Sequence, residues 1–276
     1  MVNLYEDWDR LYAEANKLQV PRVEGEVFCF GMGGSGVACE VMSAFYPLLR
    51  DMRYADVVIA VSYSGNTRET LEIVRKATSA GKRVVAITSG GALATLPVER
   101  IVVRGGDQPR YSFPLLFLPL VKMLRPELTE EVIRGVNANE ARRVAGDLLS
   151  AIRGRIPVFY ASIYLGLAKR FKQEINENAK YPAFFGEIPE VNHNEIEGYA
   201  HGSGLFPVVF SSGPLDEVTA SLVNAKVIRV SGIRDVSLLI QSAGFLSVML
   251  ARELGEDPEK LTRIPEGRRL VERIGS

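Results

Sequence analysis

A group of hydroxyl side chains within residues 61–70 (VSYSGNTRET) is the first candidate for chemistry in this sequence. Ser62, Ser64 and Thr67 follow an apolar run and directly precede a helical pattern, which we expect Asn66 to cap. Hydroxyl groups beside the N–H donors of a helix N-terminus match the oxygens of a phosphate monoester. The segment therefore predicts a phosphate-binding loop, although such residues often serve only as turn and cap residues.

A glycine cluster at residues 31–36 (GMGGSG) follows another apolar run, and its backbone could approach an anion closely. The cluster satisfies the G-x-G-x-x-G pattern of dinucleotide-binding proteins, but that pattern indicates an anion before it indicates a nicotinamide cofactor. A dinucleotide site also needs a carboxylate after the next strand, whereas Asp51 and Asp56 lie before it. Two adjacent loops of this kind favour a phosphate monoester, and a tight turn without a ligand is the alternative.

Proton-transfer chemistry is suggested by Glu177 and His193, which lie in the polar stretch 176–199. A carboxylate and an imidazole could move a proton on a sugar, and Arg110 could stabilise the negative charge that such a reaction creates. Each residue also has a simpler interpretation. Glu177 could be a solvated charge at a helix end, His193 a hydrogen-bonded loop residue, and Arg110 a partner in a surface salt bridge.

The elements that must position these residues alternate between apolar strands and amphipathic helices. Strands this apolar are typical of a parallel sheet with helices on both faces. The order strand, helix, strand recurs after a helical run that ends near residue 152. We therefore predict the α/β class, with two doubly wound parallel-sheet subdomains at residues 1–152 and 153–276.

The amino-acid composition argues against nucleic acid and membranes as binding partners. Lys plus Arg equals Asp plus Glu, 33 of each, so no overall charge favours nucleic acid or an anionic membrane. The longest apolar runs, such as residues 114–121, are too short to span a bilayer, and the acidic N-terminus does not resemble a signal peptide. These features predict a soluble protein in the cytoplasm.

The metal-binding residue types are scarce. Cys29 and Cys39 have a spacing that fits no zinc or redox motif, and we interpret both as buried side chains that fill space. His193 and His201 are the only histidines, so a histidine-rich metal centre is not expected. We predict chemistry without a metal or a cofactor.

Four stretches in order resemble the archaeal-type bifunctional phosphoglucose/phosphomannose isomerases of the sugar isomerase (SIS) domain superfamily. They are GMGGSG at 31–36, VSYSGNT at 61–67, QPR at 108–110, and NENAK at 176–180 followed by HNEIEG at 193–198. The serine loop is shared across the superfamily, whereas NENAK sixteen residues before HN is much more specific.

The resemblance implies two SIS subdomains, a site between them, and a homodimer that completes the site. It implies a metal-independent interconversion of glucose 6-phosphate, and of mannose 6-phosphate, with fructose 6-phosphate through a cis-enediol. Glu177 would move the proton between C1 and C2, His193 of the partner subunit would help to open the ring, and Arg110 would stabilise the enediolate. The implied substrate-binding residues are Ser62, Ser64 and Thr67 at the phosphate, with Gly33, Gly34 and Ser35 lining the site.

The C-terminal segment departs from the family pattern T-P-x-I-x-x-L-K. This sequence reads LTRIPEGRRLVERIGS, so that Thr262 aligns with the family's substrate-binding threonine if one residue is deleted. The catalytic lysine then falls on Arg268, which cannot donate a proton as readily, and Lys260 is a nearby substitute.

A sugar-phosphate-binding regulator without catalytic activity is the rival class, because related domains serve as ligand-binding parts of regulators. Such proteins usually add a DNA-binding segment, and no helix-turn-helix with a basic face stands out here. A sensor would also have no use for Glu177 and His193 at the family spacing.

Overall fold

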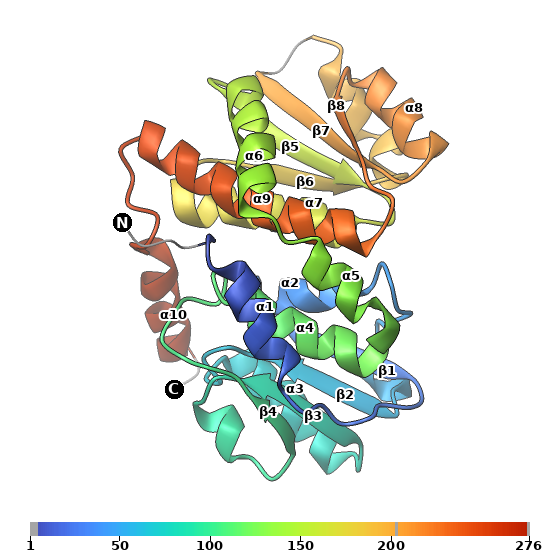
Figure 1. The fold of residues 1–276 in the computed structure, drawn as a ribbon, viewed down its shortest axis with the longest axis vertical. Coiled ribbons are helices and arrows are strands. Elements are labelled where there is room, and N and C mark those ends of the chain that lie inside the picture. Colours follow the sequence, from blue (N-terminus) through green and yellow to red (C-terminus); the bar gives the residue numbers. More distant parts are fainter. Residues whose placement is uncertain (1–4, 202–203, 275–276) are drawn as a thin grey trace.

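The computed structural model describes residues 5–201 and 204–274. The chain forms two four-stranded parallel sheets, one above the other in Figure 1, with helices on both faces of each, as the sequence predicts. The strand order is β1-β2-β3-β4 in the first sheet and β6-β5-β7-β8 in the second. The second order places β5 and β7 in the centre, so that the connection from the edge strand β6 to β7 passes over β5.

The first half of the chain contains the helix and strand sequence that the apolar runs predict. Its elements are α1 Trp8–Asn16, β1 Val27–Gly31, α2 Gly33–Met42, β2 Val57–Val61, α3 Arg68–Ser79, β3 Arg83–Thr88, β4 Glu99–Val102, α4 Phe113–Leu124, α5 Thr129–Arg134 and α6 Ala138–Ile152. The second half contains β5 Ile156–Ala161, α7 Leu165–Glu174, β6 Phe184–Glu187, β7 Leu205–Ser211, α8 Pro214–Leu222, β8 Lys226–Arg229, α9 Ile233–Glu253 and α10 Arg263–Ile274.

Strand β2 shows why these runs are apolar without interruption. Val57, Ile59 and Val61 face a core between the two sheets, and Val58 and Ala60 face a smaller core under α3. Because successive side chains of a strand point to opposite faces, a strand covered on both sides must be apolar at every position.

A single large core joins the two halves. Helix α2 of the first half packs against α7 of the second, α5 packs against α9, and side chains from both halves belong to one buried cluster. Helix α6 precedes the boundary that we expected at 152/153, yet it packs along α9 of the second half. The boundary at 152/153 stays a prediction. The two halves are stabilised by one common hydrophobic core.

Two elements do not follow from our sequence interpretation. We described residues 176–199 as a polar stretch, with His193 in a loop, but Phe184–Glu187 within this stretch forms β6, which pairs with β5. The segment is short, has prolines on both sides and lies at a sheet edge with Phe184 exposed, so it lacks the pattern of a buried strand. Helix α10 was also not expected, because half of its residues are charged.

Helix α9 shows that the expectation of no membrane-length segment was too strict. Within the described residues it alone is long and apolar enough to span a bilayer, at 21 residues. However, 78% of its most apolar window is buried inside the fold, where it contacts α5, α6 and α7. A central helix that is surrounded by others is expected to be apolar all round.

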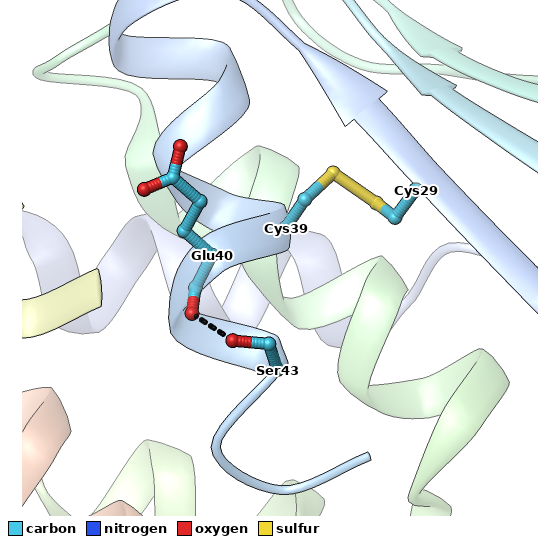
Figure 2. Close-up of a disulfide and its surroundings, with 4 residues drawn as sticks. All are labelled: Cys29, Cys39, Glu40 and Ser43. Carbon is cyan, nitrogen blue, oxygen red and sulfur yellow. Dashed lines mark hydrogen bonds between the residues drawn. A yellow bond between two sulfur atoms is a disulfide. The ribbon is translucent and has the colours of Figure 1, made fainter. Parts of the chain in front are cut away.

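Cys39 is buried and Cys29 partly buried, but the two form a disulfide, so our interpretation of them as side chains that only fill space was wrong. Cys29 lies on β1 and Cys39 on α2, and Figure 2 shows the bond joining the strand to the helix that follows it. The ten-residue separation matched no known motif, but the turn at 31–33 folds α2 back over β1 and brings the two sulfur atoms together. The bond therefore encloses the glycine loop.

We expect replacement of Cys29 by serine to lower the free energy of unfolding by about 2–3 kcal/mol, because the closed loop is short. Chemical denaturation of the wild type and the variant measures the difference. A reducing agent should lower the stability of the wild type to that of the variant and leave the variant unchanged. Equal stability of the two proteins without reductant would show that the bond contributes nothing.

Candidate functional site

The hydroxyl loop lies at the carboxyl end of β2, where the chain enters α3. Thr67 is the N-cap residue of α3, and no side chain in the described part of the chain caps this helix by a hydrogen bond. Our assignment of the cap to Asn66 was wrong, since its side-chain oxygen accepts a hydrogen bond of 2.9 Å from the Ala92 backbone. The first N–H groups of α3 are therefore open to a ligand.

The three predicted hydroxyl groups do not have equal access. Ser64 and Thr67 line a cavity. Ser62 is only 2% exposed, and its hydroxyl donates a hydrogen bond of 3.2 Å to the Thr67 hydroxyl. Ser62 thus holds the Thr67 hydroxyl in position and does not itself line the cavity.

The glycine loop at the end of β1 lies beside the hydroxyl loop. A Cβ on Gly36 would lie 2.3 Å from the Gly31 carbonyl oxygen, so α2 can pack this tightly against the strand end only without a side chain there. The Ser35 hydroxyl accepts a hydrogen bond of 3.0 Å from the Tyr63 backbone, which joins the two loops. Gly33, Gly34 and Ser35 all line the same cavity.

Glu177 and Arg110 meet at this cavity although they are 67 residues apart. Glu177 lies in a π-helical turn, Ile175–Ala179, that continues α7, and its carboxylate is 3.3 Å from the Arg110 guanidinium. The wider turn is of the kind that often marks functional sites. Arg110 is 2% exposed, so the surface salt bridge that we considered for it is excluded.

A buried polar network fixes Arg110 from behind. Its Nε donates a hydrogen bond of 2.6 Å to Asn178, and the Asn178 amide nitrogen lies 2.8–2.9 Å from oxygens of Tyr5, Glu174 and Ser247, among which it shares its two hydrogens. Burial lowers the pKa of Arg110, but the surrounding acidic groups, Tyr111 first among them, outweigh burial and hold the pKa above its ordinary value. The guanidinium is therefore a permanent and rigidly oriented positive charge.

A second buried ion pair supports the network. Arg170 and Glu174 pair within α7 and are each 1% exposed. Arg170 also donates a hydrogen bond of 2.6 Å to the Arg110 backbone carbonyl, and Tyr5 donates to Glu174. Burial raises the pKa of Glu174, a shift that Arg170 opposes. The two pairs, Arg170–Glu174 and Arg110–Glu177, are thus mechanically connected.

The main cavity has a volume of about 700 Å³, which is large enough for a sugar phosphate. The hydroxyl and glycine loops line it together with Arg110 and Glu177, and Leu261 and Ile264 from the C-terminal segment complete the lining. A side cavity of about 280 Å³ adjoins it, and Glu177, Leu261 and Ile264 line both. The main cavity offers anion donors on one side and a carboxylate beside a fixed cation on the other.

Three predicted residues besides Ser62 are not found in the lining of the main cavity. Thr262 lines the side cavity. His193 is exposed in a 3₁₀ turn, Glu190–His193, and lines neither cavity. Arg268 belongs to α10, but its side chain lies outside the described residues, so its predicted role is not tested.

Several contributors to the site were not predicted from the sequence. Ser89 lines the main cavity from the third strand-to-helix turn, and its hydroxyl donates a hydrogen bond of 2.6 Å to the Tyr63 carbonyl. A serine and two glycines after a third apolar strand were a usable signal, because carboxyl ends of parallel strands share one sheet edge. Gln108 and Asn178 lie in quoted motifs, but nothing in the sequence assigned them a role.

The second half has similar turns, in which an aspartate side chain accepts the hydrogen bonds that an anion would otherwise accept. The Asp216 carboxylate, in the first turn of α8, accepts hydrogen bonds of 2.7 Å from the Ser212 backbone and hydroxyl. Asp235 does the same for Ser231 at the start of α9. A carboxylate already occupies each helix N-terminus, where it would repel a phosphate.

No group of three or more His, Cys, Asp or Glu side chains that could hold a metal ion occurs within residues 5–201 and 204–274. The arrangement at the main cavity instead combines an anion-binding helix end, a carboxylate at the opening of a buried region and a fixed guanidinium. Such a set can bind a phosphate, transfer a proton and stabilise an enediolate.

Comparison with known proteins gives matches over nearly the whole chain. Residues 32–101 match the SIS domain model, and residues 137–270 match the model of the bacterial phospho-glucose isomerase C-terminal SIS domain. The chain is 38% identical to a D-glucosamine-6-phosphate 4-epimerase of Sulfolobus acidocaldarius, with 96% of each chain covered. It is 32% identical to a bifunctional phosphoglucose/phosphomannose isomerase of Thermoplasma acidophilum, with 86% of each covered.

The solved structures agree on the fold. A glucose-6-phosphate isomerase like protein from Thermus thermophilus superimposes with a TM-score of 0.65 at 18% identity, covering 94% of this chain and 95% of the other. At this identity the likeness supports the two-sheet architecture alone.

Proposed function

Because this chain belongs to the family of the bifunctional phosphoglucose/phosphomannose isomerases, we propose that it interconverts glucose 6-phosphate and mannose 6-phosphate with fructose 6-phosphate. The observation that carries the proposal is the main cavity, in which the uncapped N-terminus of α3 faces the Glu177–Arg110 pair. The phosphate would bind at Ser64, Thr67 and the glycine loop, and the C1–C2 end of the sugar would lie at the pair.

The reaction would proceed in two proton transfers. The Glu177 carboxylate removes the proton from C2 of the open-chain aldose, the C2–H electron pair becomes the C1=C2 double bond, and the negative charge passes to O1. Arg110 stabilises that charge. Glu177 then returns the proton to C1 while the C2 hydroxyl passes its proton to O1, so that O1 becomes a hydroxyl group and C2 the ketose carbonyl. No step requires a metal or a cofactor.

A coupled assay that follows fructose 6-phosphate formed from glucose 6-phosphate and, separately, from mannose 6-phosphate tests the proposal. We expect turnover of both sugars, unchanged by a chelator. Inactivity on both substrates, or loss of activity with the chelator, would contradict a metal-independent isomerase.

Epimerisation of an amino-sugar phosphate is the second candidate. It is favoured by the 38% identity to a D-glucosamine-6-phosphate 4-epimerase, and by the departure from the family's C-terminal lysine at Arg268. Proton NMR of a mixture with glucosamine 6-phosphate decides between the two. Formation of galactosamine 6-phosphate would support the epimerase, and fructose 6-phosphate from glucose 6-phosphate would support the isomerase.

We further propose a homodimer in which His193 of one subunit reaches the main cavity of its partner and assists ring opening. His193 is exposed beside α8, where the Thr219 hydroxyl donates a hydrogen bond of 3.0 Å to Asn192. Leu215, Val218 and Leu222 form an apolar stripe on α8 and are 49–57% exposed, as expected of a surface that another copy covers. Mixing inactive His193→Ala and Glu177→Gln proteins should restore part of the activity, because a mixed dimer holds one intact site.

Removal of the phosphate-binding hydroxyls should weaken substrate binding. We expect Ser64→Ala and Thr67→Val each to raise KM about tenfold with kcat nearly unchanged, since a hydrogen bond to a charged group is lost in ground and transition states alike. Steady-state kinetics measures the effect, with Ser79→Ala at the other end of α3 as the control. A fall in kcat without a change in KM would place the phosphate elsewhere.

A further inference from the structure

The segment that connects α9 to α10, residues 254–262, returns from the second half of the molecule to the first. We call it the C-terminal strap. In Figure 1, α10 lies beside the first sheet although it follows α9 of the second half. Leu261 at the end of the strap and Ile264 in α10 line both cavities. The strap therefore determines whether this side of the main cavity is closed.

Side chains of the site hold three consecutive backbone carbonyls of the strap. Lys180 donates to the Asp257 carbonyl, and Arg110 donates a hydrogen bond of 2.8 Å to the Pro258 carbonyl. The Gln108 amide donates a hydrogen bond of 2.7 Å to the Glu259 carbonyl. Gln108 and Arg110 belong to the first half and Lys180 to the second, so both halves hold the strap.

Gln108 connects the strap to the charged pair. Its side-chain oxygen accepts a hydrogen bond from the same Arg110 guanidinium that contacts Glu177, while its amide nitrogen holds the Glu259 carbonyl. A displacement of the strap would therefore be transmitted to Arg110.

Lys180 occupies a position where a lysine is unfavourable. Its φ of 53° lies in the left-handed region, which costs energy for a residue with a Cβ and which glycine or asparagine adopts more easily. Burial also lowers the pKa of its ammonium group, so that the charge is held against a desolvation cost. A lysine at a position with both a backbone cost and a desolvation cost indicates that its side chain has a function. Its ammonium group donates hydrogen bonds to the Asn178 and Asp257 carbonyls.

We propose that Lys180 and Gln108 are positioning residues that hold the C-terminal strap against the main cavity, so that Leu261 and Ile264 close it over a bound sugar phosphate. The proposal rests on the proposed function of this site for its substrate, but the attachment of the strap does not. Both residues lie in motifs to which the reaction itself gives them no role.

Trypsin digestion of the full chain tests the attachment without any substrate. Lys180→Met removes the ammonium group, and Gln108→Glu keeps the acceptor for Arg110 but removes the donor to Glu259. We expect each variant to be cleaved after Lys260 and Arg263 at least about fivefold faster than the wild type, with cleavage elsewhere unchanged. Lys17→Met and Gln19→Glu, both at exposed positions, are the matched controls.

Kinetics on the sugar phosphate that the wild type turns over tests the consequence. We expect both variants to raise KM about tenfold with kcat within about threefold of the wild type, and Lys180→Arg to restore KM. Unchanged cleavage at the strap would overturn the proposal, as would a large fall in kcat with KM unchanged, which would assign Lys180 to the chemistry. A wild type that turns over no sugar phosphate would overturn the proposed function, while the cleavage rates would still decide the attachment.

Discussion

Replacement of Glu177 by glutamine is expected to lower kcat about 10³-fold while KM changes little, because the variant keeps a hydrogen-bond acceptor for Arg110 but has no base to remove the C2 proton. Glutamine has nearly the same size, and Glu177 is partly exposed, so the fold should be preserved. The measurement is steady-state turnover of glucose 6-phosphate, together with deuterium incorporation at C2 in heavy water.

Glu187→Gln is a suitable control, because Glu187 is an exposed carboxylate at the end of β6, ten residues from Glu177. It should leave turnover and exchange at wild-type levels. Near wild-type turnover of the Glu177→Gln protein would show that another group is the base. Lost turnover with C2 exchange retained would show that Glu177 acts after the first proton transfer.

The second large effect is expected on stability. Arg170→Met should lower the free energy of unfolding by about 3–5 kcal/mol, because it leaves the Glu174 carboxylate buried without its countercharge. The change also removes the hydrogen bond to the Arg110 carbonyl and the stacking of the guanidinium on the Phe113 ring, 4.9 Å from its centroid. Chemical denaturation followed by circular dichroism measures the loss.

The double variant Arg170→Met/Glu174→Gln is the decisive comparison. Removing both charges eliminates the uncompensated carboxylate, so the double variant should be more stable than Arg170→Met alone. Arg143→Met serves as the control, because Arg143 and Asp147 form an exposed pair on α6, where the loss should stay below about 1 kcal/mol. A double variant less stable than Arg170→Met would mean that the hydrogen bonds that the Glu174 carboxylate accepts from Tyr5 and Asn178 outweigh the cost of its unpaired charge.

The fold could largely be predicted because buried parallel strands leave a strong sequence pattern. The continuous apolar run of β2, followed by a turn of small polar residues with Gly65 and by an amphipathic helix, has few alternative structures. Strand β6 could not be predicted, since an edge strand of four residues with exposed Phe184 leaves no such pattern. The Cys29–Cys39 bond depends on how α2 folds back over β1, which spacing alone does not reveal.

The site was predictable where a backbone requirement constrains residue type. Glycines at a strand end and hydroxyls at a helix start identify the anion-binding loops, and these loops do meet at one cavity. The surroundings of Arg110 were not predictable, because Asn178 and Pro258 come from two distant segments that only packing brings together. The exposure of His193 was not predictable either, because a sequence motif does not reveal which way a loop residue faces.

The carboxylates of Asp216 and Asp235 compete, within the molecule, with a free phosphate for the N-termini of α8 and α9. Each is tethered beside its own helix N-terminus, so its effective concentration there exceeds that of a free phosphate in solution. A phosphate could bind at either place only by displacing a group that is never far away. Both halves are built on a four-stranded parallel sheet, yet this chain is expected to take up a single equivalent of sugar phosphate, with the phosphate group at the loops of the first half.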